Sequence, residues 1–434
     1  MSGETVKRGL RESELALILL LFLISPICGR EIIPSFTDEP YPGVGSYEAP
    51  PALSTEEGGR NALGEWVFRF LEGQEEEFLR IKMLHDWVSL HITYDTEALF
   101  SGRIPPQDTA SVLRKKRAVC EGYARLFQAL VTASGAECVI IRGEVRLPLR
   151  KEKRETLSHA WNAVKIRGDW YLVDTTWDAG FLSGEGYKPR YSTAYLFIPA
   201  QEMISTHLPE DPVWQLLEKR VTREEFFSRP LLTGPYYDYF DRSSLEELRE
   251  GTSVSNPFIL DFTPKKKVRL TARIHKGGEF FPGELAWVDE EEGKLSLTLL
   301  FPESGVFDLL LFAGDPGEAR MELAGEISLH VAEGVSYTFP VAYRDFNEHQ
   351  GRLLLPRPGP LKQGEYVTFR FLLPGYAKAA FLAHEEMIPL APEGNGIFSL
   401  GLRLPRVEEL TLYGAESEEA GSWDGLLKFS LEKQ

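Results

Sequence analysis

The sequence has little cysteine, fewer positive than negative charges and no hydrophobic run long enough to span a membrane comfortably. Only three cysteines occur among 434 residues, which excludes a fold held together mainly by disulfides. The formal net charge is −17, whereas a nucleic-acid-binding surface needs a basic stripe. We therefore expect neither nucleic acid nor an anionic lipid surface as an electrostatic partner.

An apolar run lies close to the N-terminus. The thirteen residues Leu15–Ile27 read LALILLLFLISPI and follow a basic stretch that ends at Arg11. This length is short for a membrane span and typical of a signal-peptide core. Lipidation at Cys28 and simple cleavage after Gly29 remain alternatives. We expect residues 1–29 to be a signal peptide or lipoprotein signal, the protein to be exported to the periplasm or exterior, and membrane attachment to occur only through this segment.

Composition divides the rest of the chain into four parts. Residues 30–60 are rich in Pro, Gly, Ser and Glu, which predicts a flexible linker. Residues 61–235 carry mixed signals, with helices predicted over 76–90 and 118–134 and strands over 138–145, 159–166 and 170–176. Later in the chain, alternating apolar runs separated by Gly and Pro clusters predict two β-sandwich repeats, over 236–339 and 340–434.

Three pairs of segments support the repeat. SLTLLFP from Ser296 matches SLGLRLP at an offset of 103, and LLLFAG from Leu309 matches LTLYGA at an offset of 101. VRLTARI from Val268 resembles VTFRFLL from Val367, at an offset of 99. A period near 100 residues is the size of one immunoglobulin-like sandwich.

The segment AVCEGYARLF places Cys120 at the start of an amphipathic helix. An isolated free cysteine is most often buried and inert. The N-terminus of a helix, however, carries a partial positive charge and unpaired N–H groups that lower the pKa of a thiol. Cys138 lies in an apolar strand-like run and is expected to pack in the core, without a disulfide to Cys120.

A nucleophilic cysteine needs a base and a group that orients the base. His159 opens a predicted hairpin, and Asp174 is a charged residue in the apolar run WYLVDTTW of its return strand. An aspartate in such a run needs a partner. With a four-residue loop over 166–169, Asp174 lies opposite Trp161 and diagonal to His159 on the same face, so Asp174 can hold the imidazole while His159 accepts the thiol proton.

The motifs CEGYA, HAWN and DTTWD, in this order, resemble the transglutaminase-like cysteine-fold superfamily. Cys120 and His159 are 39 positions apart, and His159 and Asp174 are 15 apart. The flanks PQDTASVLRKKRAVC and THLPEDPVWQLLEKRVTREEFFSRP resemble its kyphoscoliosis-peptidase-like branch. The resemblance implies an α+β papain/transglutaminase-like core, here followed by all-β immunoglobulin-like sandwiches. It also implies a catalytic triad of Cys120 as nucleophile, His159 as base and Asp174 as the residue that orients the base.

The resemblance leaves the second donor of the oxyanion hole open. Members of the fold supply it from an upstream Trp or Gln, so Trp87 and Gln107 are the candidates. Trp161 and Trp177 are expected to line the site.

The resulting prediction is an exported cysteine peptidase or transglutaminase-like acyltransferase that forms a thioester with its substrate. The substrate is expected to be a protein or peptide, and a cell-envelope component is one candidate. The alternative is a non-catalytic cell-envelope scaffold or adhesion protein. Since no metal cluster, phosphate loop or dinucleotide fingerprint is evident, no cofactor is implied.

Overall fold

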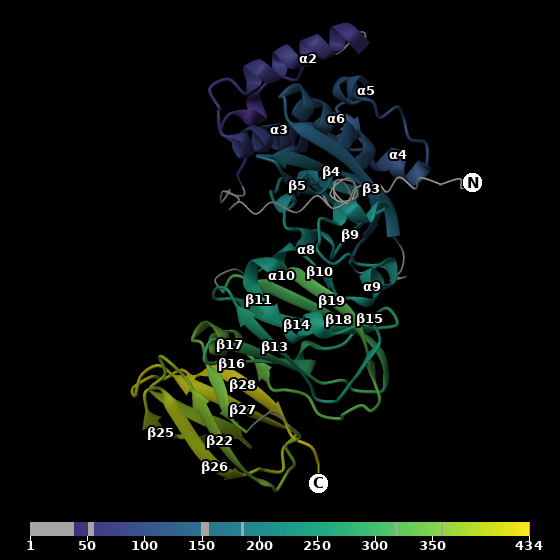
Figure 1. Ribbon diagram of the computed structural model, residues 1–434. Coiled ribbons are helices and arrows are strands. Elements are labelled where there is room, and N and C mark those ends of the chain that lie inside the picture. The colour runs from purple at the N-terminus through teal and green to yellow at the C-terminus, as the bar shows by residue number, and fades with distance from the viewer. Residues whose placement is uncertain are drawn as a thin grey trace, which may run out of the picture. The chain divides into compact units, whose positions relative to one another are not determined.

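The computed structural model describes residues 39–50, 56–148, 156–183, 186–316, 320–356 and 359–433. The predicted signal segment, residues 1–29, lies outside these ranges. The chain divides into two compact units, the first ending at Phe227 and the second beginning at Ser228 (Figure 1). Among the described residues, no helix has the length and apolar character needed to cross a membrane.

The first unit contains a layer of helices. They are α2 (Glu56–Phe70), α3 (Glu77–His91), α4 (Thr96–Ser101), α5 (Thr109–Lys115) and α6 (Cys120–Ala133), followed by the shorter α7 (Thr175–Ala179), α8 (Ala200–Met203) and α9 (Arg223–Ser228). The Glu76 carboxylate accepts a hydrogen bond from the Leu79 amide at 2.7 Å, which caps the start of α3. Helix α6 begins at Cys120 and buries the predicted face, namely Ala124, Phe127, Leu130 and Val131. The predicted helices are thus confirmed, with a short strand preceding Cys120.

A five-stranded antiparallel sheet has the strand order β8-β5-β4-β3-β9. Its strands are β3 (Glu137–Arg146), β4 (Thr156–Ile166), β5 (Asp169–Val173), β8 (Leu196–Ile198) and β9 (His207–Pro209). Lys165 pairs with Trp170, so continuing the register places Asp174 opposite Trp161, as predicted. The predicted four-residue loop is wrong, because Ile166 pairs with Asp169 and leaves a two-residue turn. This turn has left-handed backbone at Arg167 (φ 51°) and Gly168 (φ 96°), which is the geometry of a tight hairpin turn.

Helix α6 packs on strands β3 and β4, and α3 packs on α6 and α7. The main core of this unit lies among these elements and includes Leu84, Phe127 and Val164. Two smaller pairs of strands complete the unit. They are β1 (Thr93–Tyr94) with β2 (Arg117–Ala118), and β6 (Gly180–Ser183) with β7 (Gly186–Pro189). The first pair is parallel and leads directly into Cys120.

Part of the segment predicted as a flexible linker differs from that prediction. Residues 39–50 include the short 3-10 helix η1 (Val44–Ser46) and pack against the helices. Val44 is 2% exposed, and the Tyr41 amide donates to Asp86 Oδ2 at 2.7 Å. The Trp66 indole donates to the Glu48 carbonyl at 3.0 Å. Composition favoured a linker here, but two aromatic residues and a buried valine give the segment enough apolar contact to dock.

The second unit contains two β-sandwiches. In the first, one sheet has the order β11-β13-β17-β16 and the other β10-β19-β18-β14-β15, with β12 also paired to β19. The strands are β10 (Leu231–Leu232), β11 (Phe240–Ser243), β12 (Thr252–Val254), β13 (Phe258–Pro264), β14 (Arg269–Lys276), β15 (Glu279–Phe280), β16 (Ala286–Glu291), β17 (Lys294–Leu299), β18 (Gly305–Gly314) and β19 (Glu322–Val331). Helix α10 (Gly234–Tyr239) and the 3-10 helices η3 (Ser244–Glu247) and η4 (Gly283–Leu285) connect them.

The second sandwich repeats this topology. Its sheets have the orders β21-β22-β26-β25 and β20-β28-β27-β23-β24. The strands are β20 (Val341–Ala342), β21 (Arg352–Leu355), β22 (Tyr366–Leu372), β23 (Lys378–Ala383), β24 (Glu386–Pro389), β25 (Ala391–Gly394), β26 (Ile397–Arg403), β27 (Glu409–Ala415) and β28 (Asp424–Ser430), with helix α11 (Arg344–Glu348) after β20. Each sandwich has its own core, around Leu297 and Phe307 in one and around Phe369 and Leu412 in the other.

The matching topologies correct one of the three sequence pairs. Strand β17 corresponds to β26 and β18 to β27, in agreement with the pairs that begin at Ser296 and Leu309. Strand β22, which contains Val367, corresponds instead to β13, and the counterpart of β14 is β23. The pair that began at Val268 is therefore wrong, because strands with the same apolar alternation resemble one another whatever their place in a sheet.

The domain limits remain predictions. Strand β10 pairs with β19 through Leu231 and Leu232, so these residues form part of the first sandwich although they precede the predicted boundary at 235.

Candidate active site

Cys120 is the first residue of α6, and Val119 is the residue before it in extended conformation (φ −90°, ψ 178°). No side chain caps this end of α6. Instead, the Val119 amide donates to Gln107 Oε1 at 3.0 Å. The partly exposed thiol of Cys120 therefore lies at the positive end of the helix dipole. This confirms the predicted position of Cys120 in the fold.

His159 lies on β4 and is 7% exposed. Its Nε2 atom lies 2.7 Å from Oδ2 of Asp174, a hydrogen-bond distance. The same imidazole is the main influence that lowers the pKa of the Cys120 thiol. Because Nε2 bonds to the carboxylate, Nδ1 is the ring nitrogen left for the sulfur. The structure thus brings together the three residues that the sequence motifs predicted.

Asp174 directly follows β5 and caps α7. Its Oδ1 atom accepts hydrogen bonds from the amides of Thr176 at 2.8 Å and Trp177 at 3.2 Å. Its Oδ2 atom contacts His159 and a second histidine, His207, at 3.2 Å. The carboxylate is 1% exposed, yet four donors surround it. This explains how a charged residue is accommodated at the end of an apolar strand.

The charges of the three residues reinforce one another. Burial alone lowers the pKa of His159, but the charge and hydrogen bond of Asp174 outweigh it and raise that pKa to about 10. Burial raises the pKa of the Cys120 thiol, but the hydrogen bond and positive charge of His159 outweigh this effect and lower it. Cys138 has no such partner, and burial raises the pKa of its thiol to about 12. Both shifts favour the charged forms, a thiolate on Cys120 and an imidazolium on His159.

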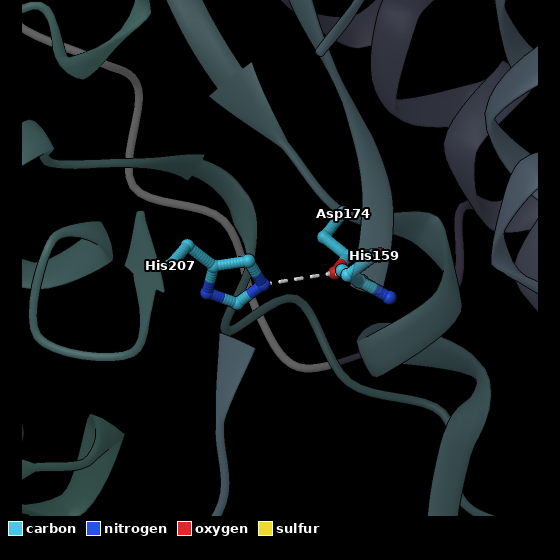
Figure 2. A group of neighbouring side chains, drawn as sticks. All are labelled: His159, Asp174 and His207. Atoms are coloured by element: carbon cyan, nitrogen blue, oxygen red, sulfur yellow. Dashed lines mark hydrogen bonds and ion pairs between the residues drawn. The ribbon is translucent and has the colours of Figure 1, made fainter. Parts of the chain in front are cut away.

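Sequence reasoning missed His207. This residue lies on β9, is 1% exposed, and points its Nε2 atom at Asp174 (Figure 2). Its Nδ1 atom lies 2.8 Å from the Thr206 hydroxyl. Burial lowers the pKa of His207 to about 4, so the ring is neutral at ordinary pH. The one signal in the sequence that could have identified His207 is its position, next to Thr206 and before the apolar residues Leu208 and Pro209.

Aromatic rings surround the two histidines. The Trp161 ring is stacked against His159 with centroids 6.1 Å apart and meets His207 edge-on at 5.1 Å. The Trp177 ring lies 6.0 Å from His159 and 4.5 Å from His207. Both tryptophans therefore lie where the sequence placed them, against the catalytic candidates. They keep water away from the His159–Asp174 pair, which strengthens its electrostatic interaction.

The structure separates the two oxyanion candidates. Gln107 contacts the Val119 amide directly before Cys120, and its Nε2 atom donates to the Pro105 carbonyl at 2.9 Å. Trp87 is 1% exposed, and its indole N–H donates to the Tyr47 carbonyl at 3.3 Å. Of these two candidates, Gln107 alone contacts the helix end that carries the thiol, through its side-chain oxygen, and this contact leaves Gln107 as the candidate.

A second buried ionic network lies behind the site. The His85 nitrogens lie 2.9 Å from Asp86 Oδ1 and 3.0 Å from Asp178 Oδ2. Lys82 contacts Asp86 at 2.7 Å. Although burial alone lowers the pKa of His85, the two carboxylates raise it to about 9. Because Asp178 belongs to the DTTWD motif, this network fixes α7, and with it the cap formed by Asp174, on α3.

His159, Asp174 and His207 offer atoms within 4.8 Å of one another that are chemically suited to a transition metal. The 2.7 Å and 3.2 Å contacts, however, already satisfy these atoms as hydrogen bonds. We therefore describe the group as a hydrogen-bonded cluster.

Comparisons with known proteins agree with the sequence motifs. Residues 64–175 match the family model described as the transglutaminase-like superfamily. This region includes Cys120, His159 and Asp174 and excludes His207. The predicted resemblance to the superfamily is confirmed, as is the fold class of a transglutaminase-like core with immunoglobulin-like sandwiches.

Over 184 residues the chain is 28% identical to mouse (Mus musculus) kyphoscoliosis peptidase and 26% identical to the human (Homo sapiens) protein. Each match covers 41% of this chain and 28% of the relative, so the chain matches less than a third of these proteins' length. A crystal structure of a TGase is 20% identical and has a TM-score of 0.24, covering 33% of this chain and 38% of that one. The identities to the two kyphoscoliosis peptidases confirm the predicted resemblance to that branch.

Proposed function

We propose that the protein is a cysteine enzyme that cleaves or transfers acyl groups at peptide or carboxamide bonds. The observation that carries this proposal is the 2.7 Å contact between His159 and Asp174, together with the lowering of the Cys120 pKa by the same imidazole. A thiol at the positive end of a helix, paired with a carboxylate-bound imidazole, has the chemistry of an activated nucleophile.

In the proposed reaction, the Cys120 thiolate attacks the substrate carbonyl carbon and forms a tetrahedral oxyanion. The backbone N–H of Cys120 and the amide of Gln107 stabilise that oxygen. The His159 imidazolium then protonates the departing amine, and the C–N bond breaks to leave a thioester on Cys120. His159 next removes a proton from water or from an acceptor amine, whose attack on the thioester releases the product and restores the thiolate.

Asp174 stays ionised throughout this cycle. Its charge stabilises the imidazolium and its position fixes which nitrogen of His159 faces the sulfur. Attack by water gives hydrolysis, and attack by an amine gives transglutaminase-like transfer. We favour hydrolysis of a protein or peptide outside the cytosol, because the N-terminal segment has the pattern of an export signal.

Activity profiling tests the proposal. The full chain is incubated with peptide libraries and glutamine-amide libraries, with and without a primary amine, and products are identified by mass spectrometry. We expect turnover by the wild type and by Cys138→Ala, and none by Cys120→Ala. Absence of both turnover and any acyl adduct on Cys120 would favour the alternative of a non-catalytic scaffold.

A further inference from the structure

His207 occupies a place in the site that no motif assigns. It lies on β9, the edge strand beyond β3, and its Nε2 atom lies 3.2 Å from Asp174 Oδ2. In Figure 2 the His207 ring points its Nε2 atom at the Asp174 carboxylate. Two imidazoles from different strands therefore share one carboxylate oxygen, Oδ2.

The hydrogen bonds of His207 define its tautomer. Asp174 Oδ2 only accepts, so Nε2 of the neutral ring carries the proton and donates it at 3.2 Å. Nδ1 is then an acceptor, and the Thr206 hydroxyl lies 2.8 Å from it. The charged or titratable groups that influence His207 are Asp174 and His159. His207 thus acts as a neutral donor whose orientation is set by its neighbour in the chain.

This donor completes the surroundings of the Asp174 carboxylate. Oδ1 is held by the amides of Thr176 and Trp177, whereas Oδ2 is held only by the two imidazoles. Without His207, the two amides would still hold Oδ1, but His159 would be the one remaining partner of Oδ2 among the described residues. With His207 in place, Oδ2 has one favoured direction, which is the one that aligns His159.

We propose that His207 is a positioning residue that holds Asp174 in the orientation that keeps His159 aligned with Cys120. This inference rests on the proposed function, because it assigns His207 a part in activating the same thiol. In this arrangement the Thr206 hydroxyl orients His207, His207 orients the Asp174 carboxylate, and Asp174 orients the His159 ring.

A purely structural role would require only that an aromatic ring fill the space. The rings of Trp161, Trp177 and Tyr195 all lie within 5.5 Å of the His207 ring centroid, so a phenylalanine would preserve much of this packing. Glutamine, in contrast, loses the ring but can place an N–H donor near the position of Nε2. The pair His207→Phe and His207→Gln therefore separates packing from hydrogen bonding.

The experiment measures the rate of alkylation of Cys120 by iodoacetamide against pH in the full chain, mapped by peptide mass spectrometry. We expect His207→Phe to move the midpoint of this profile upward by about one unit, which is about a tenfold loss of rate below the midpoint. We expect His207→Gln to remain within about twofold of the wild type, since a displacement of 0.3 units corresponds to a factor of two. Thermal melting of the same samples reports packing separately, and His91→Gln is the matched histidine control because its ring bonds only backbone.

Two outcomes overturn the inference alone. One is a reactive wild-type Cys120 whose pH profile is unchanged in His207→Phe, and the other is an equal loss of rate in the Phe and Gln variants. A wild-type Cys120 that reacts no faster at pH 6 than a free cysteine derivative overturns the proposed function, and the inference with it. The two failures are therefore distinguishable by the wild-type profile.

Discussion

Nε2 of His159 lies 2.7 Å from Oδ2 of Asp174, although His159 is on β4 and Asp174 follows β5. The hairpin register produces this contact, since the pairing of Lys165 with Trp170 leaves Asp174 opposite Trp161. A local turn of two residues, Arg167 and Gly168, therefore determines the central electrostatic contact of the site. The predictions below test what this contact does.

The two cysteines are expected to differ sharply in reactivity. The pKa of the Cys120 thiol is lowered by His159, whereas burial raises that of Cys138 to about 12. At pH 6 an ordinary thiol with a pKa of about 8.5 is less than about one percent ionised. Iodoacetamide at pH 6 should thus label Cys120 quickly and Cys138 scarcely, as measured by peptide mapping.

His159→Ala should raise the pKa of Cys120 and slow its labelling at least about tenfold, since one unit of pKa is a factor of ten in thiolate. Asp174→Ala should have a smaller effect, because Asp174 does not contact the sulfur. Cys138→Ser serves as the control and should leave Cys120 labelling unchanged. Equal rates for both cysteines would mean that Cys120 is an ordinary thiol.

Gln107 is expected to act in the transition state. Gln107→Glu keeps an oxygen that accepts from the Val119 amide but removes the N–H donor. Since loss of one oxyanion donor costs about 10²–10³ in kcat, we expect a decrease of that size, with little change in KM and in melting temperature. The measurement uses the best substrate from profiling.

Trp87→Phe is the comparison, because Trp87 was the other candidate from the sequence. Its indole bonds to the Tyr47 carbonyl, so its removal should lower stability and leave kcat unchanged. A loss of kcat in Trp87→Phe, together with full activity in Gln107→Glu, would reverse the assignment of the oxyanion donor.

Gly143 should tolerate no side chain. A Cβ atom at this position on β3 would lie 2.2 Å from the Leu208 carbonyl oxygen and 2.8 Å from the Trp161 ring. Gly143→Ala is therefore expected to lower the free energy of unfolding by about 2 kcal/mol, and to slow Cys120 labelling by displacing Trp161 from His159. Denaturant unfolding measures the first effect and alkylation the second.

Gly64→Ala is the matched control for Gly143→Ala. Gly64 lies in α2 and has no atom within 4 Å of an added Cβ. Alanine in a helix interior is favoured over glycine by about 0.5–1 kcal/mol, so this variant should be neutral or slightly more stable. Equal free energies of unfolding for the two variants would show that the close packing of Trp161 on β3 does not contribute to stability.

The buried His85 network should make stability depend on pH. In the folded state the pKa of His85 is raised from 6.5 to about 9. A raised histidine pKa stabilises the fold fully below the unfolded value, and this contribution is lost as pH rises from about 6.5 to about 9. The loss is on the order of 3 kcal/mol.

The raised pKa of His159 also makes stability depend on pH. The contribution of His85 is therefore measured as the difference between the wild type and a His85 variant. Chemical denaturation from pH 6 to pH 9.5 should show a smaller decline in His85→Gln than in the wild type, although the variant is less stable at pH 6. Parallel pH profiles for the two proteins would show that His85 is not charged in the fold.

The N-terminal segment should direct export. A reporter fused after residues 1–60 is expected outside the cytosol, because a basic start and an apolar core form a signal. Cys28→Ser distinguishes the two alternatives, since it should release a lipid-anchored reporter from the membrane and leave a cleaved one unaffected. A reporter confined to the cytosol would contradict export.

The local parts of this protein could be predicted from its amino-acid sequence. Cys120 at a helix start, His159 and Asp174 on a hairpin, and the strand alternation of two sandwiches all follow from patterns within a few dozen residues. Such patterns are readable because helix periodicity, strand alternation and hairpin register depend on neighbours in the chain.

The groups that complete the site from distant parts of the sequence could be identified from the three-dimensional fold alone. His207 reaches Asp174 from an edge strand 33 residues further along the chain, and Asp178 meets His85 across 93 residues. Residues 39–50 pack on α3. In the second sandwich, β22 is equivalent to β13 of the first sandwich and not to β14. A buried polar residue shows in sequence that it needs a partner, but the identity of that partner depends on the path of the chain, which local periodicity does not encode.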